Sequence, residues 1–286
     1  MSKKLLEPGL PRGFEDSFGK SLLIEKKIKE IIENNFLRYG YAEIKSSPFE
    51  YTENIGGLLT DDLNNFSKDI FTFDDKDKKI SLRFDLSAPL ARIVSEKYLE
   101  FAFPFRRFQI AEVFRNETSK TGRGRYRSFF QGDFDQIFLG KVPPQANSEI
   151  LQIICDTMLD LKFKKEQFKI NIFNRKIIDG FLNDLKIKDE NQKFKVLRAI
   201  DKFDRIDENF IDLLQKERVD PVSGDKIAGA NLSNDQATEV VEFLKLKDLK
   251  NLKLESKNEL QKEGVKELEE ILEILNEDKY LDQVQV

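Results

Sequence analysis

The sequence predicts an α+β fold in which an antiparallel sheet is flanked by helices and followed by a small helical module. Two stretches, at about 105–115 and 128–138, alternate apolar and polar side chains, which is typical of strands buried on one face. Apolar residues at helical spacing precede and follow these stretches. From about residue 187 onward helical patterns dominate and aromatic residues become fewer.

The chain begins with an irregular segment and a long predicted helix. Prolines and glycines interrupt residues 1–19. The apolar residues that follow at helical spacing are Leu23, Ile24, Ile28, Ile31, Ile32 and Phe36. They predict an amphipathic helix of about five turns that ends before Gly40. Pro48 interrupts the next short strand, which places that proline at a sheet edge or a subunit boundary.

The pattern over residues 69–100 predicts a hairpin followed by a helix. In its second strand, Ile80, Leu82 and Phe84 share one face, and Ser81, Arg83 and Asp85 share the other. Ser87 is a suitable N-cap for the helix, with Pro89 in its first turn. Asp85 is therefore expected where a strand runs into a helix N-terminus, on the polar face.

The strands at 105–115 and 128–138 carry the residues that we expect to do chemistry. One face of each is rich in phenylalanine, and the members of those faces are Phe108, Ile110, Phe114, Phe130, Phe134 and Phe138. The opposite faces hold Arg107, Gln109, Val113, Arg115, Phe129, Gln131, Asp133 and Asp135. Antiparallel pairing would make a polar floor with Arg115, Gln131, Asp135 and the ring of Phe129. Such a floor could hold a zwitterion and a nucleobase.

The loop between these strands is basic and longer than the about 2–5 residues usual in hairpins. It contains Lys120, Arg123, Arg125 and Arg127 against Glu117 alone, and its two glycines allow close approach to a ligand. Arginine presents a planar fork that matches phosphate oxygens, so the loop predicts a triphosphate clamp. A solvated surface loop or general RNA contacts are the alternatives for this segment taken alone.

The composition excludes several functions. The chain has no histidine, which removes histidine-based catalysis and histidine metal ligands. Its formal net charge of -4 provides no overall basic field for nucleic acid. Cys155 lies in an apolar run and is expected to be a buried structural thiol. We find no signal peptide and no run near the roughly 20 apolar residues of a membrane span, so we expect a cytoplasmic protein that contacts no membrane.

Several motifs resemble one enzyme family. FRNE…GRGRYRSFFQGDFD, residues 114–135, resembles motif 2 of class II aminoacyl-tRNA synthetases, specifically of histidyl-tRNA synthetase. SLRFDLSAPLAR resembles the family's histidine-binding segment, and PRGFED, the long helix and YGYAEIKSSPFEY resemble its N-terminus and motif 1. The resemblance implies a class II synthetase-like core with motifs 1 and 2 at 1–186. A helical insertion domain at 187–280 and the start of a return to the core at 281–286 are also implied.

The resemblance also implies a role for each matching residue. Those assigned to ATP are Arg115 on the α-phosphate, Glu117, Arg125 and Arg127 along the nucleotide, and Phe129 on adenine. Those assigned to the histidine pocket are Asp85, Ser87, Gln131 and Asp135. Asp85 would accept from the α-ammonium group and Asp135 from an imidazole N–H, and no residue is assigned to a metal.

The implied function is that of a histidine–tRNA ligase. ATP and histidine would form histidyl-adenylate with Mg²⁺ as cofactor, and the acyl group would then pass to tRNA-His. A homodimer through motif 1 is also implied. Ser87 stands where the family usually has threonine, and Phe84 where it has proline. The chain stops at YLDQVQV, before the Arg-Gly-Leu-(Asp/Glu)-Tyr-Tyr segment, motif 3 and the anticodon-binding domain of the family. We therefore expect little aminoacylation by this chain alone.

Three alternatives remain at this point. A regulatory subunit of ATP phosphoribosyltransferase shares the fold without charging tRNA, but it tends to lose the loop arginines, whereas Arg125 and Arg127 are present. A non-catalytic RNA-binding module would not need Gln131 and Asp135 on the face of Arg115. Within the ligase interpretation, the helical module either contacts the tRNA acceptor arm or is a solvated bundle.

Overall fold

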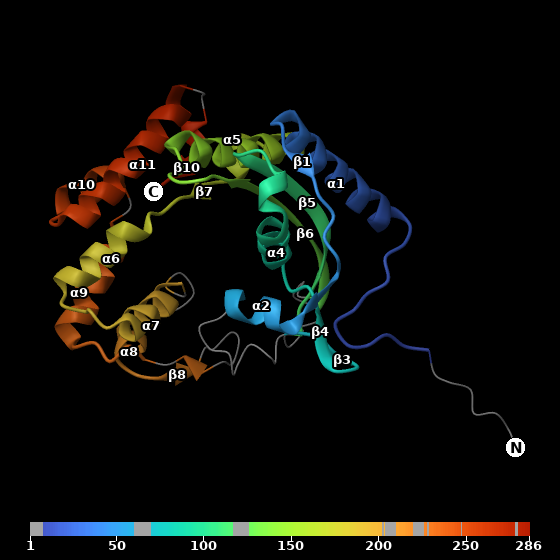
Figure 1. Ribbon diagram of the computed structural model, residues 1–286. Helices are drawn as coiled ribbons and strands as arrows, with labels where there is room; N and C mark the ends of the chain where they lie inside the picture. Colours follow the sequence, from blue (N-terminus) through green and yellow to red (C-terminus); the bar gives the residue numbers. More distant parts are fainter. Residues whose placement is uncertain are drawn as a thin grey trace, which may run out of the picture. The chain divides into compact units, whose positions relative to one another are not determined.

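The structure is a computed structural model, drawn as a ribbon in Figure 1. It describes residues 8–59, 70–116, 126–201, 203, 210–219, 226–227, 229–246, 248–277 and 280–286. The chain packs as two compact units. Unit 1 comprises residues 1–142 and 156–162, and unit 2 comprises residues 143–155 and 163–286. Helix α5, Pro144–Asp160, contributes residues to both.

Unit 1 is built on a three-stranded sheet in the order β1-β5-β6. Strands β5, Phe105–Phe114, and β6, Ser128–Ile137, pair antiparallel along their full ten-residue length, from Phe105 opposite Ile137 to Phe114 opposite Ser128. The short strand β1, Ala42–Glu43, runs parallel to β5. The long hairpin predicted from the alternating pattern is confirmed, and its curvature is visible in Figure 1.

The phenylalanine face of this sheet packs against helix α1, Lys20–Arg38. The ring of Phe36 lies 5.2 Å from that of Phe108 and 4.8 Å from that of Phe134. Arg38 at the end of the helix pairs with Asp156 at 2.7 Å. The predicted helix of about five turns is therefore confirmed. Phe36 anchors its end to the sheet, and Arg38 anchors it to α5.

A second three-stranded sheet in unit 1 has the order β2-β4-β3 and is antiparallel throughout. The elements around it are β2, Phe49–Tyr51; α2, Thr52–Leu59; β3, Thr72–Asp75; β4, Lys78–Leu82; α4, Ser87–Lys97; and η1, Tyr98–Glu100. The polar side of the β4 segment is the better buried one, since Ser81 is 0% and Arg83 8% exposed. Both are buried because hydrogen bonds satisfy them inside the unit.

Unit 2 is mainly helical. Its helices are α6, Arg175–Asp184; α7, Glu190–Ile200; α8, Phe210–Gln215; α9, Asn234–Leu244; α10, Leu249–Glu255; and α11, Glu259–Glu277, with 3₁₀ turns η2, Lys165–Gln167, and η4, Leu281–Gln283. Its core includes Ile177, Leu182, Val196, Leu213 and Val240. Cys155 is buried, as predicted. Among the described residues, no helix has both the length and the apolar character needed to cross a membrane.

Unit 2 also contains two strand pairs. Strand β7, Ile170–Asn171, pairs in parallel with β10, Val284–Gln285. Strand β8, Arg218–Val219, pairs antiparallel with β9, Lys226–Ile227. Each has only two residues per strand, which is too short for a periodic signal.

Packing divides the chain at different positions from the predicted boundary at 186/187. Helix α6 precedes that boundary but packs on α11, where Lys176 contacts Glu263 and Glu267 at 2.7 Å each. The carbonyl of Gly180 accepts from Asn258 at 2.9 Å. The assignment of residues 187–280 as an insertion domain therefore stays a prediction about function.

Candidate active site

The register of β5 and β6 determines which side chains share the polar floor. Directly opposed residues of an antiparallel pair project to the same face. The opposed pairs on this face are Arg107 with Asp135, Gln109 with Asp133, Ala111 with Gln131, and Val113 with Phe129. Arg115 comes directly after β5, and as an odd-numbered residue it continues the face of Arg107, Gln109 and Val113. The expectation that Arg115, Phe129, Gln131 and Asp135 lie on one face of the sheet is confirmed.

The guanidinium of Arg115 is held by an amide, a carbonyl and two rings. Its Nη2 donates to Oε1 of Gln131 at 3.4 Å, and its Nε donates to the carbonyl of Phe84 at 3.4 Å. The same group lies 4.5 Å from the ring centroid of Phe84 and 5.1 Å from that of Phe129. Cation–π contacts of this kind add to the hydrogen bonds in fixing its place.

Gln131 links Arg115 to Asp133. The Nε2 of Gln131 donates to Oδ1 of Asp133 at 2.9 Å. Because Oε1 already accepts from Arg115, the carboxylate of Asp133 selects the amide orientation that presents oxygen to the arginine. We did not assign a role to Asp133 from the sequence, although its place on the polar face could have suggested one.

Asp135 pairs with Arg107 and not with Arg115. Nη2 of Arg107 forms an ion pair with the Asp135 carboxylate and also donates to the carbonyl of Leu86 at 3.4 Å. Burial lowers the pKa of Arg107, while Asp135 acts against that change. Burial also raises the pKa of Asp135, with Arg107 opposing the rise and Asp133 adding to it. Arg107 is a second arginine of the site to which sequence reasoning gave no role.

Asp85 and Ser87 lie at the start of α4. The prediction that Ser87 is the N-cap is wrong, because Ser87 is the first helical residue and Leu86 occupies the cap position. Oδ1 of Asp85 instead accepts from the backbone N–H of Ala88 at 3.0 Å. Asp85 is close enough to influence the pKa of Asp135, which it raises. The Ser87 side chain is exposed.

The predicted nucleotide loop is described only at its base. Glu117 and Arg125 lie outside the described residues. Arg127 donates its N–H to the carbonyl of Gly13 at 2.7 Å, and its own carbonyl accepts from the N–H of Arg115 at 2.8 Å. Immediately after the loop, these two hydrogen bonds connect the residue before β6 to Arg115 and to the N-terminal segment.

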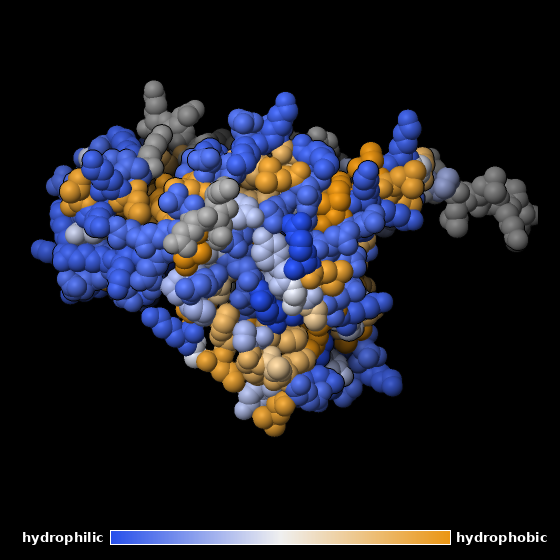
Figure 2. All heavy atoms as spheres, turned by 90° about the horizontal axis from the view of Figure 1, so that it is seen from above, coloured by the Kyte–Doolittle hydropathy of each residue, from blue (hydrophilic) through white to orange (hydrophobic). Residues whose placement is uncertain are grey.

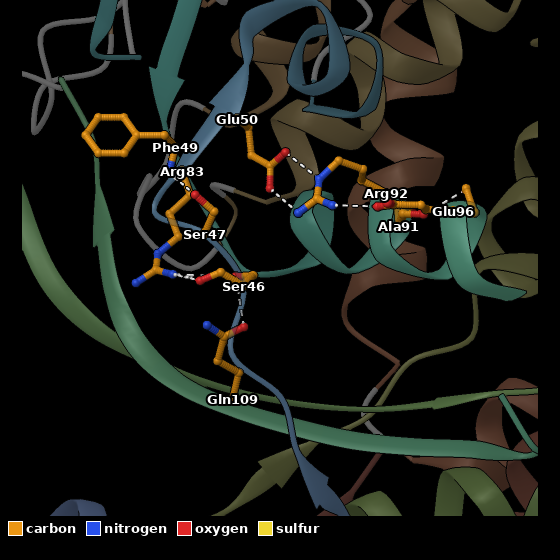
Figure 3. Close-up of polar contacts among 10 residues, drawn as sticks. Ser46, Ser47, Phe49, Glu50, Arg83, Ala91, Arg92, Glu96 and Gln109 are labelled. Atoms are coloured by element: carbon orange, nitrogen blue, oxygen red, sulfur yellow. Dashed lines mark hydrogen bonds and ion pairs between the residues drawn. The ribbon is translucent and has the colours of Figure 1, made fainter. Parts of the chain in front are cut away.

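A polar network connects the floor to α4 and β2 (Figure 3). Oγ of Ser46 donates to Oε1 of Gln109 at 3.0 Å, and the backbone carbonyl of Ser46 accepts from Nη1 of Arg83 at 3.2 Å. Nε of Arg83 donates to the carbonyl of Glu112 in β5 at 2.7 Å. Glu50 and Arg92 form a two-pronged ion pair, at 2.6 and 2.9 Å. Arg83 thus links the segment before β2 to β5, and the Glu50–Arg92 pair links β2 to α4.

A metal ion held by protein side chains alone needs several ligand groups close together. The described residues contain no group of three or more histidine, cysteine, aspartate and glutamate side chains that could hold a metal ion. Mg²⁺ usually takes one or two protein carboxylates together with substrate phosphates and water. An ion held in that way would depend on the phosphates of bound ATP as well as on the protein.

Comparison with known proteins relates this geometry to one family. The family model described as histidyl-tRNA synthetase matches residues 13–223. The histidine–tRNA ligase of Pelagibacter ubique is 49% identical over 283 residues, which are 98% of this chain and 60% of the relative. The histidine–tRNA ligase of Bradyrhizobium diazoefficiens is 36% identical over 286 residues, or 94% of this chain and 56% of the relative. The chain thus spans less than two thirds of these relatives.

Two solved structures resemble the fold. A histidyl-tRNA synthetase from a Nostoc species gives a TM-score of 0.74 at 22% identity, covering 97% of this chain and 59% of the other. An ATP phosphoribosyltransferase regulatory subunit/histidyl-tRNA synthetase from Bacillus halodurans gives 0.76 at 18% identity, covering 99% and 68%. These likenesses confirm the class II synthetase-like α+β fold. Because the family model matches well over half of the sequence, the chain belongs to the histidyl-tRNA synthetase family.

Proposed function

We propose that the protein is a cytoplasmic histidine–tRNA ligase that activates histidine with ATP and transfers it to tRNA-His. The observation that carries this proposal is the shared face of β5 and β6. Along that face lie the cation of Arg115, the ring of Phe129, the amide of Gln131 and the carboxylate of Asp135. Family membership and the ligase relatives support the same function.

The nucleotide would lie over the half of the floor nearest the loop. Arg115 would contact the α-phosphate. Its guanidinium is held in place by Gln131, and because that amide carries no charge, the positive charge of Arg115 is left for the phosphate. Adenine would stack on Phe129, whose ring is half-buried. Glu117, Arg125 and Arg127 would complete the contacts to ATP from the loop and its base.

Histidine would lie toward the opposite end of the hairpin. Asp135 would accept from an imidazole N–H, and Asp85 would accept from the α-ammonium group. Gln131 and Ser87 would supply neutral hydrogen-bonding groups. Three carboxylates, Asp85, Asp133 and Asp135, act electrostatically on Arg107, so negative charge gathers at this end of the site. That charge suits an amino acid with an ammonium group and a basic ring.

The first chemical step needs alignment more than proton transfer. The carboxylate of histidine is already ionised at neutral pH and attacks the α-phosphorus without a general base. The bond from that phosphorus to the bridging oxygen breaks, and pyrophosphate leaves. Arg115 would stabilise the negative charge that develops on the phosphorus oxygens. An enzyme without histidine side chains can therefore carry out this step.

The larger assembly would have two functional parts and a dimer contact. Residues 1–186 would form the catalytic core, and residues 187–280 an insertion domain. A homodimer would form through motif 1, because the first half of α1 leaves apolar side chains uncovered. Leu23 is 66%, Ile24 59% and Ile28 40% exposed. Hydrophobic residues reach the surface among hydrophilic ones in several places on the face drawn in Figure 2.

Histidine-dependent exchange of pyrophosphate into ATP tests the activation step. Replacing Arg115 with alanine should lower the exchange rate by about 10²–10³, the usual effect of removing one preorganised charge contact. Arg175→Ala is a matched control, because Arg175 is an exposed arginine of α6 whose ion pair, within the described part of the chain, is with Asp179 of the same helix. Near-normal exchange in Arg115→Ala would contradict the proposal. Histidine binding without exchange, together with binding to a phosphoribosyltransferase subunit, would instead support a regulatory subunit.

A further inference from the structure

Arg107 is a buried charge on the floor of the proposed site. Its side chain is 0% exposed, and β5 places it directly opposite Asp135 in β6. The ion pair between the two is therefore set by the register of the hairpin. A charge this deep is strongly disfavoured unless a partner compensates it.

The bonding of Arg107 differs from that of a purely structural arginine nearby. Arg83 is also buried, and its Nε and Nη1 donate to the backbone carbonyls of Glu112 and Ser46. In Arg107, only Nη2 has partners, and neither Nε nor Nη1 has one among the described residues. Backbone carbonyls thus satisfy Arg83, whereas Arg107 is committed mainly to the Asp135 carboxylate.

We propose that Arg107 is a positioning residue of the histidine pocket, which fixes the Asp135 carboxylate in the orientation that receives an imidazole N–H. This inference rests on the proposed function. A carboxylate has two oxygens, and an ion pair through one of them leaves the other for the ligand. A lysine would carry its charge on a compact ammonium at the end of a flexible stem, so it would not hold the carboxylate from the same fixed position.

Arg107 would also keep Asp135 ionised while the site is occupied. The charged groups that act on Asp135 are Arg107 from β5, Asp133 from β6 and Asp85 before α4, and Tyr41 lies close enough to be affected by it. The acidic neighbours and burial raise its pKa, and Arg107 alone opposes them. Removing the positive charge would therefore protonate Asp135 at a higher pH. As the solution is acidified, a variant without Arg107 would therefore lose histidine binding at a higher pH than the unmodified chain does.

The test uses the absence of histidine from the chain. Proton NMR can follow the imidazole signals of added histidine without any histidine background from the protein. Affinity is measured between about pH 5 and 8, around the usual imidazole pKa, for the unmodified chain, Arg107→Lys, Arg107→Met and the control Arg83→Lys. The pKa of free histidine is common to all four, so differences between profiles come from the protein.

We expect Arg107→Lys to weaken histidine binding about ten-fold, the usual effect of losing one charge-assisted contact. Arg107→Met should weaken it at least as much and should move the acid limb of the profile to higher pH. ATP affinity should stay within about two-fold, because Arg107 is remote from the assigned nucleotide contacts. Arg83→Lys should leave the profile where it is, since Arg83 pairs with backbone carbonyls.

The outcomes separate this inference from the proposed function. If the unmodified chain binds no histidine, the proposed function fails. If it binds histidine and Arg107→Lys keeps both affinity and profile, the inference alone is wrong. An equal effect of Arg83→Lys would show a structural role and would also overturn it. Should Arg107→Met not fold, Arg107→Lys must lose its effect when combined with Asp135→Asn, and full additivity would contradict the inference.

Discussion

At the scale of single residues, the site depends on which charges the hairpin pairs. Alternation in the sequence correctly predicted that Arg115, Gln131 and Asp135 share a face. It could not predict that Arg107 is the partner of Asp135, because the register depends on how the long loop closes. The predicted cap of α4 was wrong for a similar reason. Asp85 and Ser87 are both residue types that cap helices, and the sequence alone does not show which side chain accepts from the first turn.

The link from Arg115 through Gln131 to Asp133 leads to a prediction. In Asp133→Ala the Gln131 amide loses the acceptor that selects its orientation, so its oxygen faces Arg115 for only part of the time. Pyrophosphate exchange should fall about ten-fold, as for the loss of one hydrogen bond to a charged group. Asp133→Asn keeps an acceptor oxygen and should lose less. Equal rates in Asp133→Ala and the unmodified chain would exclude this role.

At the scale of elements, strong local periodicity was a reliable guide. Helix α1 and the β5–β6 hairpin follow their patterns closely. The prediction was less informative for β4, where the polar side is the buried one. Arg83 and Ser81 are satisfied there by partners distant in sequence, such as Glu112 and Thr52. Such partners cannot be inferred from a local pattern.

The ion pair between Glu50 and Arg92 connects β2 to α4 and should contribute to stability. The Glu50 side chain is only 4% exposed, so Arg92→Met would leave a buried carboxylate without its arginine. We expect unfolding by urea to show a loss of about 3 kcal/mol. The double variant Glu50→Gln with Arg92→Met should recover much of that loss. Arg175→Met breaks an exposed pair and should cost less than about 1 kcal/mol, and an equal cost would refute the buried-pair argument.

At the scale of the whole molecule, the family and fold class could be predicted and the packing units could not. The resemblance of motifs in order along the chain implied the class II fold, which the structural likenesses confirm. The packing units differ from the predicted boundary because α6 packs on α11, many residues later in the chain. Nothing in the local composition marks such a long-range contact.

The uncovered half of α1 gives a prediction about assembly. Replacing both Leu23 and Ile24 with aspartate would place two charges in the proposed dimer contact. Sedimentation velocity should show a dimer for the unmodified chain and a monomer for this variant, because an unpaired charge in an apolar contact is strongly disfavoured. Lys26→Asp and Lys27→Asp, made together between the apolar positions, serve as a charge-change control. A monomeric unmodified chain would rule out a dimer through α1.

The most direct test of the central claim is a crystal structure of the chain with histidine and ATP. The account predicts histidine on the face of β5 and β6 that carries Arg107 and Asp135, with an imidazole N–H on the Asp135 carboxylate. It also predicts the adenine ring against Phe129 and the α-phosphate at Arg115. Density for both ligands on the opposite, phenylalanine-rich face of the hairpin, or only in unit 2, would contradict it.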